Sequence, residues 1–254
     1  MSTPYRLIQI SDTHIHADPR HRMGTLDSAA SLQTILKSIQ TGSKHVDSLV
    51  LSGDLSEDGS TASYRRLKEI LSPIDCPMDC MPGNHDDPKT LTEELVGGDI
   101  GQRRAFQIPG WQIVLLNSHV TNQTAGRLSS DELAFLDTTL GDARSLAGLV
   151  FLHHPPVSIG SPWMDAMGLL EPEAFRQTVA GHPQIRIVAF GHIHQAFDVS
   201  RYGVRWLGVP STCVQFTPQA HEHLRDPLPP GFRWFELYPD GSYRTGIKRV
   251  HLDQ

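Results

Sequence analysis

The stretch LVLSGDLSE, Leu49 to Glu57, shows how this chain brings a charged side chain to the edge of a sheet. Its apolar residues lead through Ser52 to Gly53, where the chain can turn, and then to the carboxylate of Asp54. Such a run predicts a buried strand with an acid at its carboxyl end. Ligands of open α/β sheets bind beyond the carboxyl ends of the strands, so Asp54 is a candidate functional residue.

Four other apolar runs end in oxygen or imidazole donors in the same way. They are IQISDTH at residues 8–14, MPGNHD at residues 81–86, FLHH at residues 151–154 and VAFGHIH at residues 188–194. We expect these five strand ends to converge, with Asp54 between two metal ions. Asp12 and His14 are two positions apart, so on an extended strand end both side chains would lie on one side and bind the same ion.

Seven side chains make up the candidate metal site: Asp12, His14, Asp54, Asn84, His153, His192 and His194. The set mixes oxygen and nitrogen donors and contains no thiolate, which suits Fe, Mn, Co or Zn ions and not a structural zinc–cysteine site. One tetrahedral ion that also holds water cannot take so many ligands, so we expect two ions that share a carboxylate. The residue pattern alone leaves open whether His153 or His154 is the ligand.

Hydrophobic periodicity along the rest of the chain predicts an α/β protein. Besides the strand that begins at residue 49, strands are expected at residues 5–10, 78–81, 104–108, 111–117, 149–152, 185–190, 197–202, 204–207, 233–238 and 242–250. Helices are expected at residues 26–39, 60–72, 90–96, 129–140 and 171–180. The alternation of strands and helices in the first third implies parallel strands with right-handed crossovers. Residues 211–231 are Pro-rich, and we expect a functional or mobile loop on the substrate side.

Length and composition indicate an ordinary globular protein with a single domain, residues 1–254. Of the 254 residues, 39% are hydrophobic and 20% are charged, and no linker divides them. A net charge of −6 argues against a nucleic-acid partner, and no apolar stretch approaches the roughly 20 residues of a membrane span. Three cysteines without a CxxC pair, and a start without a secretory pattern, favour the cytoplasm. We expect a small-molecule partner. Edge strands and the 211–231 loop are candidate surfaces for a homodimer, but the residue pattern does not decide the oligomeric state.

The five blocks resemble the calcineurin-like metallophosphoesterases, whose motifs DxH, GD, GNHD, HH and GHxH occur here in that order. They stand at residues 12–14, 53–54, 83–86, 153–154 and 191–194. The resemblance implies an α/β fold of the four-layer αββα sandwich kind. It also implies that the first ion is bound by Asp12, His14, Asp54 and His194, and the second by Asp54, Asn84, His153 and His192. It therefore selects the first of the two adjacent histidines.

Three segments resemble, more narrowly, the bacterial class III 3′,5′-cyclic nucleotide phosphodiesterases: HHPPVSIG at residues 153–160, GHIHQ at residues 191–195 and PSTCVQF at residues 210–216. This resemblance implies hydrolysis of 3′,5′-cyclic nucleotides, cAMP first, to 5′-monophosphates by a metal-bridging hydroxide. The alternatives are a broader phosphodiesterase acting on glycerophosphodiesters or 2′,3′-cyclic nucleotides, and a non-catalytic scaffold. Serine/threonine protein phosphatases fit less well, because GDLSED stands where that family has GDxVDRG.

Residues beside the ligands have expected roles in this chemistry. We expect His85 to hydrogen-bond the phosphate and to protonate the leaving 3′ oxygen, and Asp86 to orient the His85 ring. Substrate contacts are expected from His14, Asn84, His85 and His194.

Two features near the expected site have open roles. Trp163, Met164 and Met167 follow the segment of residues 153–160 and would either cover a nucleobase or form a stripe that packs in the core or against another subunit. His221 and His223 form a second HxH pattern within residues 211–231. Because no acid accompanies them, solvent exposure or a contact at the substrate rim is favoured over a third metal.

Overall fold

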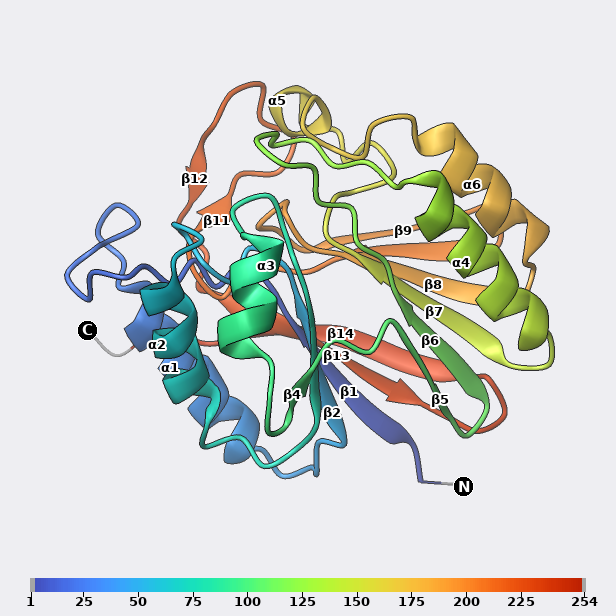
Figure 1. Ribbon diagram of the computed structural model, residues 1–254, viewed down its shortest axis with the longest axis horizontal. Helices are drawn as coiled ribbons and strands as arrows, with labels where there is room; N and C mark the ends of the chain where they lie inside the picture. Colours follow the sequence, from blue (N-terminus) through green and yellow to red (C-terminus); the bar gives the residue numbers. More distant parts are fainter. Residues whose placement is uncertain (1–2, 253–254) are drawn as a thin grey trace.

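Two six-stranded sheets contain most of the strands in the computed structural model, which describes residues 3–252 (Figure 1). The first sheet has the order β14 (Tyr243–Arg249), β13 (Gly231–Leu237), β1 (Tyr5–Ile10), β2 (Ser48–Ser52), β3 (Met78–Met81) and β4 (Ile100–Gly101). The second has the order β5 (Ala105–Ile108), β6 (Trp111–Leu115), β7 (Ala147–Leu152), β8 (Ile185–Phe190), β10 (Val204–Gly208) and β9 (Phe197–Arg201). The strands expected at residues 5–10, 78–81 and 185–190 have the predicted bounds.

Strand direction follows the predicted alternation of strands and helices. β1, β2 and β3 are parallel to one another, which confirms the strand direction expected for the first third of the chain. β6, β7, β8 and β10 are parallel in the second sheet. Antiparallel pairs add β13 and β14 to the first sheet and β5 and β9 to the second. The carboxyl ends of the parallel strands therefore share one edge in each sheet.

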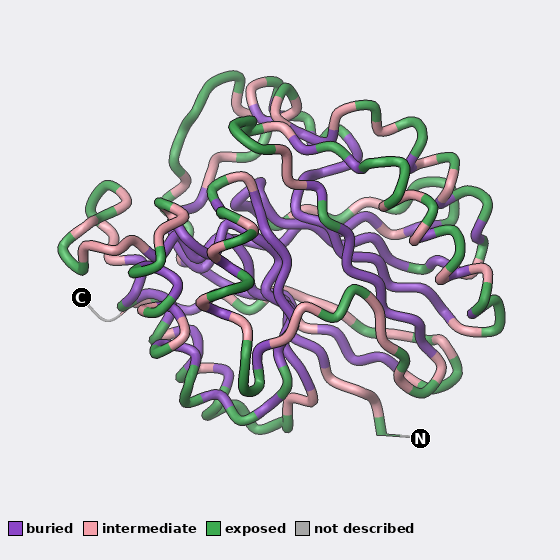
Figure 2. Tube along the Cα trace, in the orientation of Figure 1, coloured by how far each residue is buried: buried purple, intermediate pink, exposed green. Residues whose placement is uncertain are grey.

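The central strands are apolar throughout because alternate side chains enter different cores. In β2, Leu49 and Leu51 pack in an outer core, whereas Val50 packs in the core between the sheets. That inner core contains residues of both sheets, including Phe151 and Phe235, whose rings meet edge-to-face at 5.9 Å. Figure 2 shows the central strands of both sheets buried along most of their length. Such runs are typical of sheets covered on both faces.

Helices cover the outer face of each sheet (Figure 1). On the first sheet lie α1 (Ser28–Gln40), α2 (Thr61–Leu71), and α3 (Pro88–Thr90) with the π-helical turn Leu91–Leu95 that continues it. On the second sheet lie α4 (Ser130–Asp142) and α6 (Pro172–Gly181), and the short helix α5 (Pro162–Asp165) lies apart from them at the top of Figure 1. The layers helix, sheet, sheet, helix confirm the αββα sandwich. Within residues 3–252, no helix is long and apolar enough to cross a membrane.

The elements that periodicity did not predict are short. β4, α5, β11 (Gln215–Phe216) and β12 (Arg225–Asp226) each have two to four residues, too few for a repeated apolar pattern. β11 and β12 pair antiparallel inside residues 211–231, where we expected only a loop. The segment that we assigned to the substrate side is therefore partly built as a hairpin.

Candidate metal centre

All seven expected ligands lie beyond the carboxyl ends of parallel strands. Asp12 and His14 follow β1, Asp54 follows β2, Asn84 follows β3, His153 follows β7, and His192 and His194 follow β8. They are buried except for Asn84, which is half-buried. The two sheets are joined at this point, because the backbone N–H of His192 donates to Asp12 Oδ1 at 3.1 Å. The structure thus brings five strand ends of two sheets together.

The backbone at these strand ends is left-handed and not extended. β1 ends before Asp12, and Asp12 and His14 have φ angles of 56° and 46°. The argument that placed both side chains on one side of an extended strand is therefore wrong, although the two residues do share a site. Asp54, His192 and His194 have φ angles of 49°, 68° and 49°. This conformation costs about 1–3 kcal/mol per residue and is concentrated at functional sites.

Two imidazoles face each other where the first ion is expected. His14 Nδ1 donates to Glu57 Oε2 at 2.6 Å, and His194 Nδ1 donates to the Val214 carbonyl at 2.9 Å. In its neutral form each ring therefore presents a bare Nε2, and the two Nε2 atoms lie 3.1 Å apart. Asp12 Oδ1 is 3.3 Å from the His194 Nε2. Two nitrogen lone pairs that face each other beside a carboxylate can bind a cation. Two ligand atoms that each lie about 2.1 Å from the same ion are separated by a distance comparable to the 3.1 Å between these nitrogens.

Three buried donor atoms mark the place of the second expected ion. Asn84 Oδ1, His153 Nε2 and His192 Nε2 have no hydrogen-bond partner among residues 3–252. His153 Nδ1 donates to the Ser52 carbonyl at 2.8 Å, which leaves its Nε2 bare at 3.3 Å from Asp54 Oδ2. Buried polar atoms rarely lack a partner, and a metal ion would provide one for the His153 and His192 nitrogens, which lie within 4.8 Å of each other. The residues present therefore fit this ion as well.

His154 is the alternative ligand that the sequence pattern left open. Its Nε2 is also buried and unpartnered in the described part of the chain, close to donor atoms of His153 and His192. Its Nδ1 is paired with Ser118 Oγ at 2.8 Å. The 3.3 Å contact between His153 and Asp54 favours His153, because Asp54 is the carboxylate expected to be shared.

Burial and charge set the pKa values at this centre. Burial would raise the pKa of Asp54, but the charge and hydrogen bond of His153 outweigh it and hold that pKa well below its usual range. Burial would lower the pKa of His153, and the Asp54 carboxylate raises it to about 9. In His192, burial and the charge of His153 lower the pKa to about 3. Asp54 is therefore ionised and His192 is neutral, the states in which each can bind a metal.

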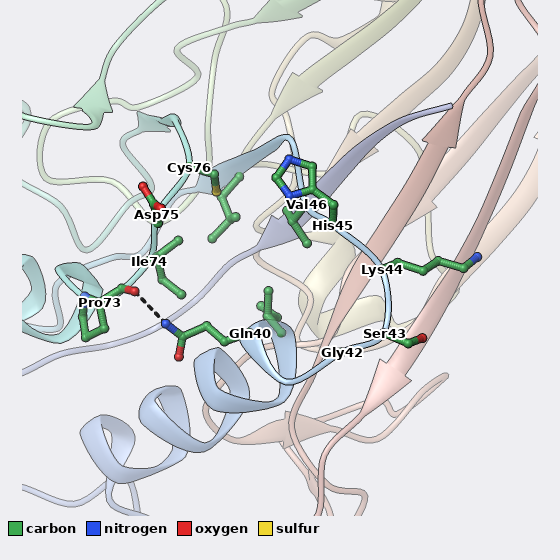
Figure 3. Close-up of a pocket in the computed structure, with 12 residues that line it drawn as sticks. Gln40, Gly42, Ser43, Lys44, His45, Val46, Pro73, Ile74, Asp75 and Cys76 are labelled. Atoms are coloured by element: carbon green, nitrogen blue, oxygen red, sulfur yellow. Dashed lines mark hydrogen bonds between the residues drawn. The ribbon is translucent and has the colours of Figure 1, made fainter. Parts of the chain in front are cut away.

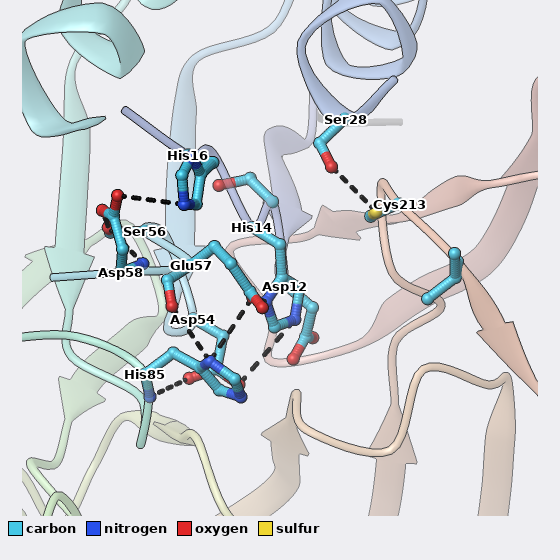
Figure 4. A network of polar contacts seen from close by, with 12 residues as sticks. Asp12, His14, His16, Ser28, Asp54, Ser56, Glu57, Asp58, His85 and Cys213 are labelled. Carbon is cyan, nitrogen blue, oxygen red and sulfur yellow. Dashed lines mark hydrogen bonds and ion pairs between the residues drawn. The ribbon is translucent and has the colours of Figure 1, made fainter. Parts of the chain in front are cut away.

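Glu57 is a residue of this centre that the sequence analysis did not single out. Its carboxylate accepts the 2.6 Å hydrogen bond from His14 and lies 3.4 Å from His85 Nδ1 (Figure 4). Its backbone carbonyl is 3.3 Å from the same His85 nitrogen. The only signal in the sequence is its place three residues after Asp54, which does not reveal where its side chain points. Glu57 thus contacts both an expected ligand and the expected catalytic histidine.

Asp86 does not have the role that we expected. Its carboxylate accepts hydrogen bonds of 2.8–3.2 Å from the backbone N–H groups of Leu55, Ser56 and Gly83 and from the Tyr64 hydroxyl. Glu57, and not Asp86, contacts the ring of His85. The expectation that Asp86 orients that ring is therefore corrected, because its side chain turns away and joins the loop after β2 to the loop after β3.

Two glycines allow the backbone to approach the donor atoms. A Cβ atom at Gly83 would lie 2.2 Å from Asp54 Oδ1 and 2.7 Å from His153 Nε2. A Cβ atom at Gly53, where φ is 94°, would lie 2.4 Å from His153 Nδ1. Neither position accepts a larger residue without displacing an expected ligand. The glycines of the GD and GNHD blocks are explained by this close approach.

The hollow shown in Figure 3 is separate from the metal centre. It has a volume of about 350 Å³ and lies at the amino ends of β2 and β3, where residues 42–46 and 73–76 lead into the strands. Lys44 at its rim is paired with the buried Glu236. Ligand sites of parallel sheets lie at the carboxyl ends of the strands, so this hollow is not the candidate active site.

Carboxylates and imidazoles gathered where two sheets meet are the ligand set of a metal-dependent hydrolase. The sequence model of the calcineurin-like phosphoesterases matches residues 5–196, and the chain belongs to this family. A 3′,5′-cyclic adenosine monophosphate phosphodiesterase of Pseudomonas aeruginosa is 38% identical over 244 residues, which cover 96% of this chain and 89% of that protein. A 3′,5′-cyclic-nucleotide phosphodiesterase of Nostoc is 36% identical over 247 residues, which cover 97% and 93% of the two chains.

A solved structure supports the same architecture. A dimetal phosphatase from Danio rerio superposes with a TM-score of 0.71 and 17% sequence identity, over 100% of this chain and 98% of that one. At this level of identity the similarity concerns the fold alone. It agrees with the sandwich of two sheets described above.

Proposed function

We propose that the protein is a two-metal phosphodiesterase that hydrolyses 3′,5′-cyclic nucleotides, cAMP first, to 5′-monophosphates. The observation that carries the proposal is the group of unpartnered donor atoms of Asn84, His153 and His192 beside an ionised Asp54. The nearly full-length similarity to proteins named as cyclic nucleotide phosphodiesterases supports the substrate class. We assign Asp12, His14, Asp54 and His194 to the first ion, and Asp54, Asn84, His153 and His192 to the second.

The residues of the chain bind the phosphate and move the proton. When bound, the two ions supply Lewis acidity and lower the pKa of a water that attacks the phosphorus. His85 is exposed, and its Nδ1 lies 3.4 Å from the Glu57 carboxylate. Its Nε2 can donate to the phosphate or to the leaving 3′ oxygen. Asn84, next to His85 in the chain, would contact the same phosphate. The expected contacts of His14 and His194 with the phosphate would be made through the ion that they bind, because the Nδ1 atoms of these rings donate to Glu57 and to the Val214 carbonyl.

A substrate panel tests this proposal against its rival, a broader phosphodiesterase of glycerophosphodiesters or 2′,3′-cyclic nucleotides. We expect the highest kcat/KM on cAMP when the metal-loaded protein is compared on cAMP, 2′,3′-cAMP and glycerophosphocholine. We also expect elemental analysis to find two ions per chain, and fewer in the control variant Asp54→Asn. Faster hydrolysis of either of the other diesters would favour the rival. A metal-loaded sample that is inert even on bis(p-nitrophenyl) phosphate would favour the scaffold.

The remaining sequence expectations become proposals of the same kind. We propose that the ions are Fe, Mn, Co or Zn, which elemental analysis of protein purified without added metal would identify. We propose a single catalytic domain, because both sheets contribute expected ligands. Three free cysteines support a cytoplasmic location. The homodimer stays a prediction that light scattering would check.

A further inference from the structure

Three aromatic rings that are not among the expected ligands form a cluster, and one of them, Phe216, contacts the metal centre. They belong to Trp163 of α5, and to Phe216 and His223 of the β11–β12 hairpin. The ring centroids are 5.2 Å apart for Trp163 and Phe216, 5.3 Å for Trp163 and His223, and 4.9 Å for Phe216 and His223, and every pair is edge-to-face. Two segments that are distant in the sequence, and are seen near each other at the top of Figure 1, thus build one aromatic cluster.

Phe216 joins this cluster to the metal centre. Its ring stacks on the ring of His194, with centroids 4.3 Å apart and an interplanar angle of 11°. Its backbone N–H also donates to the His194 carbonyl at 3.1 Å. Exposure increases outward, from the buried His194 through the half-buried Phe216 to the exposed His223. An aromatic surface therefore runs from an expected metal ligand to the solvent.

Contacts outside the cluster hold the hairpin in position. Arg225 donates to the Met23 carbonyl at 3.4 Å and packs against Gly24. Arg249 donates to Gln215 Oε1 at 2.6 Å. Rings held on a supported hairpin need less ordering when a ligand binds, which favours binding.

The indole of Trp163 supplies an unused donor. Its Nε1 is buried and has no hydrogen-bond partner in the part of the chain that the structure describes. Indole N–H groups usually find a partner when they are buried. A purine base offers what this cluster lacks, since its flat face can stack on aromatic rings and its ring nitrogens accept hydrogen bonds.

We propose that Trp163, Phe216 and His223 form the subsite for the purine base of the nucleotide, an inference that rests on the function proposed above. The phosphate would lie at the metal centre, and the base would extend past His194 along the cluster toward His223. The subsite would make a nucleotide a better ligand than a diester or monoester without a base.

The contribution of the base to affinity is measured by comparing 5′-AMP with ribose 5-phosphate, which has the same phosphate and no base. Both ligands are titrated into the metal-loaded full chain. Isothermal titration measures both dissociation constants without any turnover. We expect 5′-AMP to bind about tenfold more tightly, the contribution of one stacked base. Trp163→Ala and His223→Ala should each reduce this ratio about threefold or more while the affinity for ribose 5-phosphate stays within about twofold. Trp163→Phe, which keeps a ring but loses the N–H, should give an intermediate ratio.

His221→Ala is the matched control, because it removes an exposed histidine of the same loop and should leave the ratio unchanged. The inference is overturned if the wild-type ratio is one, or if neither Trp163→Ala nor His223→Ala changes it. If the variants lose affinity for 5′-AMP and for ribose 5-phosphate equally, the cluster only supports the fold. Turnover of cAMP is measured separately. If 5′-AMP binds more tightly than ribose 5-phosphate but cAMP is not hydrolysed, the proposed reaction is refuted. If cAMP is hydrolysed but the variants do not change the affinity ratio, only the subsite is refuted.

Discussion

Substitution of Glu57 tests whether a carboxylate that hydrogen-bonds an expected ligand, His14, controls metal binding. The 2.6 Å hydrogen bond from His14 to Glu57 fixes the ring so that its Nε2 faces the first ion site. Burial would raise the pKa of Glu57, but the hydrogen bond and charge of His14 outweigh it, so that pKa lies below its usual value. Glu57→Gln removes the charge and keeps an acceptor, whereas Glu57→Ala removes both.

The expected magnitude follows from this single contact. A hydrogen bond to a charged group contributes about 1.5–3 kcal/mol, and substitutions behind metal ligands commonly weaken binding about 10–100-fold. We therefore expect Glu57→Gln to weaken binding of the first ion about tenfold, and Glu57→Ala about 100-fold. The assay is calorimetric titration of the metal-free protein with Mn²⁺, with the two binding steps fitted separately.

Asp58→Asn is the control for the Glu57 variants. Asp58 is the adjacent carboxylate, and it accepts from the backbone N–H groups of Ala17 and Ser60 without contacting His14 (Figure 4). Its variant should bind Mn²⁺ like the wild type. Wild-type affinity in Glu57→Ala, or an equal loss in Asp58→Asn, would refute the reasoning, because the effect would then not depend on the contact with His14.

Three further changes have defined outcomes. His85→Ala should lower kcat about 100-fold or more while elemental analysis still finds two ions per chain; loss of the ions would instead make His85 structural. Because a ligand must be unprotonated and Asp54 raises the pKa of His153 to about 9, affinity for the second ion should rise with pH up to about 9. Binding at pH 7 should therefore release about one proton, and calorimetric heats that do not depend on the buffer would contradict this. Removal of the ions with a chelator should lower the free energy of unfolding. The expected loss is about 2.7 kcal/mol for each ion whose free concentration was 100 times its Kd. An unchanged midpoint of urea unfolding would contradict this prediction.

The strands and long helices could be predicted because burial on both faces of the sheets leaves a strong pattern. β2 has apolar residues throughout because Leu49 and Val50 enter different cores. The β11–β12 hairpin could not be predicted, because its strands have two residues each and its position depends on distant contacts. The contact of Arg225 with the Met23 carbonyl is one of these, and it has no local sequence signal.

Residue type and order could predict which donor side chains meet at this site, but they could not predict its geometry. Donor residues at the ends of apolar runs indicated which strand ends should meet. The left-handed backbone at Asp12 and His14 depends on hydrogen bonds to the loop after β2, such as His14 N–H to the Asp54 carbonyl at 3.0 Å. The expected role of Asp86 was wrong and that of Glu57 was missed for the same reason, since side-chain direction after a strand end is decided by the loop.

Neither sheet could build the metal centre alone. The first sheet carries Asp12, His14, Asp54 and Asn84, and the second carries His153, His192 and His194. Carboxylates thus come from one sheet and most imidazoles from the other, so the inner core that packs the sheets together also sets the distances between opposite charges. Without an ion, the proton on His153 offsets the buried charge of Asp54. An ion would replace that proton and bind residues of both sheets at once, which explains the left-handed backbone at Asp12, Asp54 and His192 and the unpartnered nitrogens of His153 and His192 where the two sheets meet.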